Sequence, residues 1–190
     1  MRAFIAIELP QEIKNRITGL QKELQRTGAD VKWVEPRNIH LTLKFLGEIN
    51  KDMFIKLIGI IENLAKNNQP FTASLFSLGV FPKTDFARVI WTGIDKGEKE
   101  TTLLAKDLED RIQGLGIPKE NRPFSTHITL GRIRSTKNRE KLMPAILELG
   151  KELGKENLEF NIEKIVLFKS SLTSSGPIYE TLKEVSLTAT

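Results

Sequence analysis

The chain of 190 residues contains no cysteine, only two histidines and one tyrosine, and no long apolar run. Without cysteine it has no disulfide, no thiolate zinc site and no cysteine nucleophile. No segment approaches the roughly 18 consecutive apolar residues of a membrane-spanning helix. The apolar run at residues 3–7 is too short for a signal-peptide core. We therefore expect a cytoplasmic protein that does not act in a membrane.

The composition is that of a globular protein, with 39% apolar and 28% charged residues. A net charge of +5 and a pI near 9.4 favour an anionic partner such as nucleic acid. Many of the lysines and glutamates fall on expected solvent-facing sides of helices, so charge alone does not identify the partner. No sequence feature determines the oligomeric state, and a monomer is the simplest expectation.

Strand patterns and helical apolar spacing alternate along the chain in two matching halves. The expected strands are residues 3–9, 31–36, 39–46, 71–78, 87–94, 124–133, 160–170 and 178–187. The expected helices are residues 13–24, 54–64, 103–112 and 138–154. This order predicts an α+β fold in which residues 1–190 form one unit of two lobes packed side by side.

The two histidines have the same neighbours. His40 lies in "HLTLKFLG" and His127 in "HITLGRI", so each begins the pattern His-x-Thr-Leu. Because side chains in a strand alternate between faces, each motif shows an imidazole and a hydroxyl on one face and apolar side chains on the other. A single histidine on a strand is usually structural, but the repetition favours a functional pair.

Two imidazoles on opposite walls of a cleft suit in-line displacement at phosphorus, which needs a base at the entering oxygen and an acid at the leaving one. Imidazole can do either at neutral pH. The hydroxyls of Thr42 and Thr129 are placed to bind the non-bridging oxygens, where negative charge develops. The pattern therefore predicts His40, Thr42, His127 and Thr129 as catalytic.

Other classes have less support. A metal site is not expected, because the chain has two histidines and no acidic residue within two positions of either motif. A serine hydrolase is disfavoured because no G-x-S-x-G sequence occurs. The main alternative to an enzyme is a non-catalytic module that binds RNA ends in a basic cleft. Catalytic turnover would separate the two.

The motifs also carry a family resemblance that extends over the whole chain. Together with "MRAFIAIELP", "VKWVEPRNIHLTLKFLG", "RPFSTHITLGRI" and "LFKSSLTSSGPIYETLKEVSL", they resemble the two-histidine (HxTx) phosphoesterase superfamily. The resemblance is specifically to the bacterial and archaeal RNA 2′,3′-cyclic phosphodiesterases, also called 2′-5′ RNA ligases. It implies two pseudo-symmetric antiparallel sheets flanking a central cleft, with helices outside, and neither metal nor cofactor.

The same resemblance implies a reaction. Water attacks a 2′,3′-cyclic phosphate at an RNA 3′ end, and a 2′-phosphate remains. The alternative within the family is reversible joining to a 5′-hydroxyl end through a 2′-5′ linkage. The residues do not fix which histidine is the base, and we favour His127 as base and His40 as acid.

Four further residues are candidates for substrate binding. Phe45 is suited to stack on a base, and Arg122 and Arg132 to bind phosphate. Strict alternation from the histidines places Lys44 on the cleft face as a further phosphate ligand. The same alternation turns Phe45 and Arg132 away from the cleft, unless the strands end or are bulged there.

Overall fold

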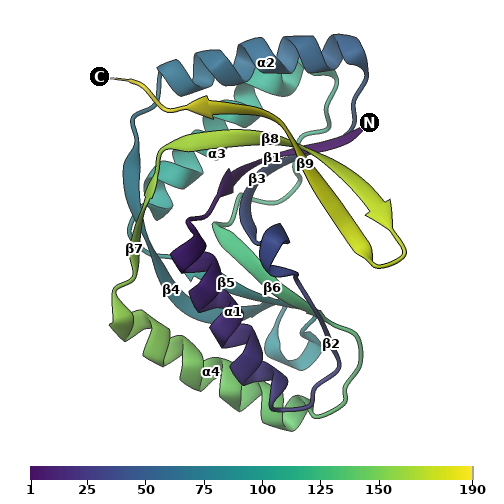
Figure 1. The fold of residues 1–190 in the computed structure, drawn as a ribbon, viewed down its shortest axis with the longest axis vertical. Helices are drawn as coiled ribbons and strands as arrows, with labels where there is room; N and C mark the ends of the chain where they lie inside the picture. The colour runs from purple at the N-terminus through teal and green to yellow at the C-terminus, as the bar shows by residue number, and fades with distance from the viewer. Residues whose placement is uncertain (190) are drawn as a thin grey trace.

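The structure is a computed structural model and describes residues 1–189. Four α-helices and two antiparallel sheets make up the described part of the chain (Figure 1). The helices are α1 (Gln11–Gln25), α2 (Lys51–Lys66), α3 (Glu98–Ile112) and α4 (Arg139–Glu156). No helix of residues 1–189 has both the length and the apolar character needed to cross a membrane.

Each sheet takes strands from both halves of the chain. The four-stranded sheet has the order β3-β1-β8-β9, formed by His40–Glu48, Arg2–Glu8, Lys164–Thr173 and Gly176–Ser186. The five-stranded sheet has the order β2-β6-β5-β4-β7, formed by Val31–Trp33, His127–Ile133, Val89–Ile94, Phe71–Phe81 and Glu159–Ile162. The chain therefore passes between the two sheets several times.

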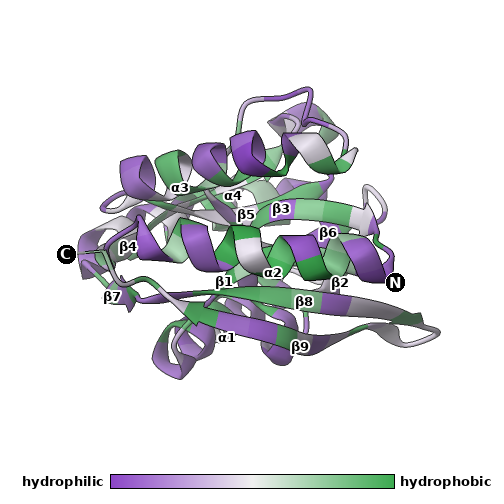
Figure 2. Cartoon of the chain, turned by 90° about the horizontal axis from the view of Figure 1, so that it is seen from above, coloured by the Kyte–Doolittle hydropathy of each residue, from purple (hydrophilic) through white to green (hydrophobic). Residues whose placement is uncertain are grey.

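The helices cover the outer faces of the sheets. In Figure 1, α2 and α3 lie over the four-stranded sheet, and α1 and α4 lie against the five-stranded one. Figure 2 shows hydrophilic and hydrophobic residues alternating along α2, whose buried positions Leu57, Ile61 and Leu64 follow helical spacing. The α2 helix begins at Asn50, whose side chain accepts a hydrogen bond from the Met53 N–H.

A single buried apolar cluster contains residues of both sheets, among them Ile5 of β1 and Leu130 of β6. The predicted α+β fold with two antiparallel sheets is confirmed, and each predicted helix is present within a few residues of its expected bounds.

Two strand predictions are wrong in detail. Residues 160–170, expected as one strand, form β7 and β8, which belong to different sheets. The buried Ile162 and Ile165 are three positions apart, so the alternation of period two breaks between them. Residues 31–36 form a strand only as far as Trp33, because the chain enters a 3₁₀ turn at Pro36.

Candidate active site

The two His-x-Thr-Leu motifs occupy equivalent places. His40 is the first residue of β3 and His127 the first residue of β6, and these strands lie close to each other where the two sheets meet. Leu41 and Ile128 are completely buried in the core, whereas both histidines are half-buried on the opposite face. The two imidazoles therefore belong to the inner faces of the two sheets.

The two imidazoles are held in the same way. Nδ1 of His40 lies 2.6 Å from the Asn38 carbonyl oxygen, and Nδ1 of His127 lies 2.9 Å from the Ser125 carbonyl oxygen. Because a carbonyl can only accept, each Nδ1 carries a proton. In the neutral imidazole Nε2 is then the unprotonated nitrogen, which can accept a proton. Nε2 of His40 lies 2.9 Å from the hydroxyl oxygen of Thr42, which belongs to the same motif.

His40 is enclosed by aromatic rings. The centroids of Phe4 and Tyr179 lie 4.9 Å and 5.3 Å from its imidazole, with Tyr179 edge-on. Burial lowers the pKa of His40 to about 4, and the nearby charge of Lys14 adds to this, although the hydrogen bond to Asn38 opposes it. At neutral pH the His40 imidazole of the unliganded protein is therefore uncharged.

His127 has a different and more open surrounding. The ring of Phe81 meets its imidazole edge-on at 5.3 Å, and Phe81 in turn stacks on Trp91 at 4.9 Å. The indole of Trp91 lies directly over Gly79, where a side chain would collide with the ring. A glycine at this place allows the aromatic wall beside His127 to lie flat on the sheet.

Both strands that carry a histidine motif have a β-bulge at a leucine of the motif. On β1, Ile5 and Ala6 are adjacent, but their partners on β3 are Lys44 and Thr42, so Leu43 is the extra residue. On β5, Ile90 and Trp91 are adjacent, but their partners on β6 are Gly131 and Thr129, so Leu130 is the extra residue. A bulge reverses the alternation of side chains beyond it.

The bulges bring Phe45 and Arg132 to the faces that carry the motif histidines. Phe45 is 59% exposed and lies 6.0 Å from the ring of Phe4, on the face that carries His40. Arg132 is exposed and near Tyr179: burial raises the pKa of that phenol, and the charges of Arg132 and Arg2 oppose the rise. Arg122 lies exposed in the loop that precedes β6.

The expected cleft position of Lys44 is wrong, because the bulge at Leu43 turns its side chain into the protein. Lys44 is 3% exposed, and its Nζ lies 2.8 Å from Oε2 of Glu109 on α3 and 2.9 Å from the Pro118 carbonyl oxygen. The Lys44 ammonium is therefore directed into the protein and away from the face of His40. It ties β3 to α3 and to the loop that leads into the His127 motif.

The bulge of β6 is also held from outside its own strand. Gln21 of α1 is 3% exposed, and its side-chain amide donates to the carbonyl oxygens of Val34 and Leu130, both at 2.8 Å. Sequence reasoning missed Gln21, which looks like one polar residue of an amphipathic helix. It also missed Tyr179, for which the only signal is that it is the single tyrosine of the chain.

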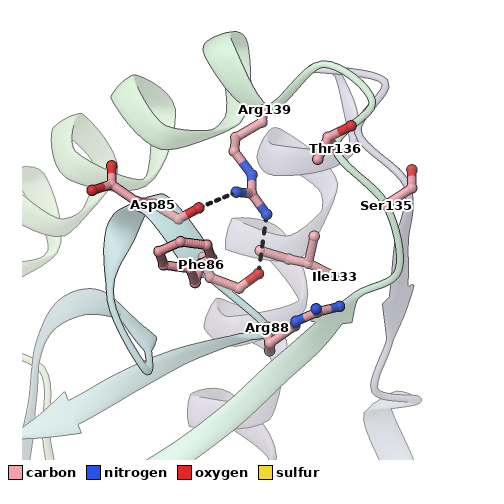
Figure 3. Close-up of a pocket in the computed structure, with 8 residues that line it drawn as sticks. Asp85, Phe86, Arg88, Ile133, Ser135, Thr136 and Arg139 are labelled. Carbon is pink, nitrogen blue, oxygen red and sulfur yellow. Dashed lines mark hydrogen bonds between the residues drawn. The ribbon is translucent and has the colours of Figure 1, made fainter.

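A separate pocket lies between the end of β6, the turn before β5 and the start of α4, with a volume of about 260 Å³ (Figure 3). Arg139 crosses it and donates to the carbonyl oxygens of Asp85 and Ala87. This arginine anchors the turn to α4, and the pocket contains neither histidine. No group of three or more histidine, aspartate or glutamate side chains arranged to hold a metal ion occurs within residues 1–189.

Comparison with known proteins accounts for the duplicated geometry. The family described as LigT like phosphoesterase matches residues 7–91 and then residues 94–179, with one histidine motif at the same offset in each match. The chain belongs to the LigT-like phosphoesterase family. The family resemblance seen in the sequence is thereby confirmed.

Relatives of this LigT-like chain are similar over their whole length. The RNA 2′,3′-cyclic phosphodiesterase of Methanocaldococcus jannaschii is 36% identical, covering 97% of this chain and 99% of the relative. The protein of the same name from Aquifex aeolicus is 35% identical, with 97% and 96% covered.

Solved structures agree with this assignment. A crystal structure of a Thermus thermophilus protein superposes with a TM-score of 0.84 at 29% identity, covering 100% of this chain and 99% of that one. Escherichia coli LigT complexed with 3′-AMP gives a TM-score of 0.76 at 25% identity, with 98% of each chain covered. The fold of this chain is thus shared with both of these solved structures.

Proposed function

We propose that this chain hydrolyses the 2′,3′-cyclic phosphate end of RNA to a 2′-phosphate, with His40, Thr42, His127 and Thr129 as catalytic residues and without a metal. The observation that carries the proposal is the matched orientation of the two imidazoles. Each is fixed by a backbone carbonyl two residues upstream, so each offers Nε2 for proton transfer. The names of the relatives support the choice of substrate.

In the proposed reaction, Nε2 of His127 takes a proton from a water molecule as the water oxygen attacks phosphorus. The bond from phosphorus to the 3′ oxygen breaks, and Nε2–H of His40 gives its proton to that oxygen. The hydroxyls of Thr42 and Thr129 donate to the non-bridging oxygens, whose negative charge grows in the transition state. Water reaches the open His127 more readily than the enclosed His40, which supports this order of base and acid.

The acid role requires that His40 be protonated, although its pKa in the unliganded protein is about 4. A phosphate anion beside the imidazole favours the charged form and raises its pKa. We therefore expect the pKa of His40 to move toward its ordinary value of about 6.5 when adenosine 2′-phosphate is bound. An NMR titration of the imidazole resonances, assigned with a His127→Gln variant, measures this. A pKa that stays near 4 at saturating ligand would contradict His40 as the acid.

The activity itself has a direct test. A short RNA ending in a 2′,3′-cyclic phosphate is incubated with the protein in excess EDTA, and the position of the product phosphate is determined. We expect full turnover and a 2′-phosphate, because imidazoles move the protons and hydroxyls stabilise the charge. Activity that is lost on chelation and restored by a divalent ion would rule out the metal-independent mechanism. Binding without turnover would leave an RNA-end-binding module.

The pseudo-symmetry of the site also favours a second candidate, the reversible 2′-5′ joining of RNA ends. Ligation is the same displacement with the 5′-hydroxyl of a second RNA attacking phosphorus in place of water, while the 3′ oxygen leaves, so each imidazole keeps its role. In the reverse reaction, in which the 3′ oxygen attacks and the 2′-5′ linkage breaks, the two imidazoles exchange roles. Adding a 5′-hydroxyl RNA to the assay above detects the joined product.

We also propose a domain organisation, an oligomeric state, a location and a partner for this chain. We infer that residues 1–190 act as one two-lobed unit, as a monomer in the cytoplasm, with RNA as the partner. The net charge of +5 and the absence of cysteine support this setting.

A further inference from the structure

Two like charges face each other at the β2 edge of the five-stranded sheet. Lys32 of β2 is the direct cross-strand partner of Arg132 of β6, and both side chains are exposed. Their strand neighbours Val31 and Ile133 point into the core, so Lys32 and Arg132 lie on the inner face of the sheet. Like charges directly opposite each other in a sheet are unfavourable unless something compensates them.

No residue of the described chain supplies that compensation. Neither Lys32 nor Arg132 forms an ion pair with a carboxylate within residues 1–189. The contrast with the adjoining residues is clear, because Arg134 lies two positions further along and is paired with Asp30 at 3.0 Å. Arg134 is thus neutralised beyond the end of β6, whereas Lys32 and Arg132 form no such ion pair within residues 1–189. The two exposed cations are therefore available to an external anion.

Lys32 and Arg132 lie near the histidine motifs. Arg132 follows the bulge of β6 as Phe45 follows the bulge of β3, so the duplicated motif presents a guanidinium on one wall and an aromatic ring on the other. Arg132 also lies near Tyr179, whose ring touches His40. The two walls therefore offer different chemistry to the two ends of a nucleotide, a ring for the base and cations for a phosphate.

We propose that Lys32 and Arg132 together bind the phosphate on the 5′ side of the terminal nucleoside, so that the site prefers RNA oligonucleotide ends to cyclic mononucleotides. The inference rests on the proposed function and specifies its substrate class. Because β2 is the edge strand of the five-stranded sheet, an RNA chain that passes over Lys32 leaves the cleft directly into solvent. Longer RNA is therefore accommodated without any further opening of the cleft.

Three substrates test this inference: adenosine 2′,3′-cyclic phosphate with a 5′-hydroxyl, the same nucleotide with a 5′-phosphate, and a dinucleotide that ends in the cyclic phosphate. Lys32→Gln is compared with Lys151→Gln, which removes the same charge from the exposed face of α4. For Lys32→Gln we expect kcat/KM to fall about fivefold on both substrates that carry the 5′ phosphate. We expect no change on the 5′-hydroxyl nucleotide, and none for Lys151→Gln on any substrate.

Salt dependence supplies a second readout. The slope of log kcat/KM against log salt for the dinucleotide should decrease by about one in Lys32→Gln, as for one lost phosphate contact. Equal losses on all three substrates, or no loss on the dinucleotide, would overturn the inference. A loss confined to the dinucleotide would assign Lys32 to the second nucleoside and overturn the phosphate contact.

Failure of the proposed function has a different signature. If the wild-type protein turns over none of the three substrates, the hydrolase proposal is wrong, and binding then decides the role of Lys32. The probe is a dinucleotide carrying a 2′-phosphate, measured at equilibrium. Unchanged affinity in Lys32→Gln would overturn the inference, and a loss of about fivefold would support it.

Discussion

Replacing His40 or His127 by alanine is expected to lower kcat/KM on an RNA 2′,3′-cyclic phosphate by about a hundredfold or more. Each variant removes one of the two Nε2 atoms that backbone carbonyls hold ready for proton transfer. The measurement is the initial rate of 2′-phosphate formation at fixed salt, because RNA affinity at a basic surface falls as ionic strength rises.

The threonine variants provide the matched comparison. Thr42→Ala and Thr129→Ala should lower kcat/KM less, by roughly tenfold to a hundredfold. Each of these variants removes a hydrogen bond to the transition state but no group that transfers a proton. Circular dichroism is used to check that each variant is folded. Folded histidine variants that keep near wild-type rates would show that both imidazoles are structural.

The pH dependence of kcat/KM assigns the roles of the two imidazoles. With one histidine neutral and the other protonated, the rate should rise and then fall with pH. In the proposed order, residual activity of the His127 variant lacks the acidic limb and that of the His40 variant lacks the alkaline limb. The reverse pattern would exchange base and acid.

The second large effect is expected on stability. Lys44→Met removes a buried cation, so the Glu109 carboxylate, which is 19% exposed, loses its cation and keeps the hydrogen bond from the Glu120 N–H, and the Pro118 carbonyl oxygen loses the hydrogen bond from Lys44. Breaking one side of a buried ion pair costs on the order of 3 kcal/mol. Urea unfolding should therefore show a large fall in the midpoint at an unchanged slope.

A double variant shows whether the lost stability comes from the broken ion pair or from lost packing. In Lys44→Met with Glu109→Leu, both charges are gone, and we expect most of the lost stability to return. If the double variant is as unstable as Lys44→Met alone, the loss comes from the shape of the lysine stem and not from an unpaired carboxylate.

Alternation predicts the face on which each motif histidine lies, and on β3 it fails four and five residues after His40. Alternation correctly places His40 and Thr42 on one face of β3 and Leu41 on the other, because this stretch pairs regularly with β1. It fails for Lys44 and Phe45 because a bulge depends on the register with the partner strand. The sequence alone indicates that Phe45 reaches the face of His40 only if the strand ends or is bulged there, but not which of the two occurs.

Contacts between distant segments account for the remaining gaps. Tyr179 completes the aromatic surround of His40 from the far end of the chain, and Gln21 reaches the β6 bulge from α1. Neither residue has a local pattern that sets it apart. The helices were easier to predict, because their buried positions recur at a spacing contained within each helix.

The pairing of β1 with β8 affects how the chain folds while it is being synthesised. One edge of β1 can pair with β3 early, but the other edge waits for residues 164–173, which are synthesised well after β1 and β3. Until then the apolar strand from Phe4 to Ile7 lacks one neighbour, and Phe168 and Tyr179 are not yet in place beside His40. A nascent or prematurely ended chain can contain both histidine motifs, yet the environment of His40 is established only when the C-terminal hairpin has docked.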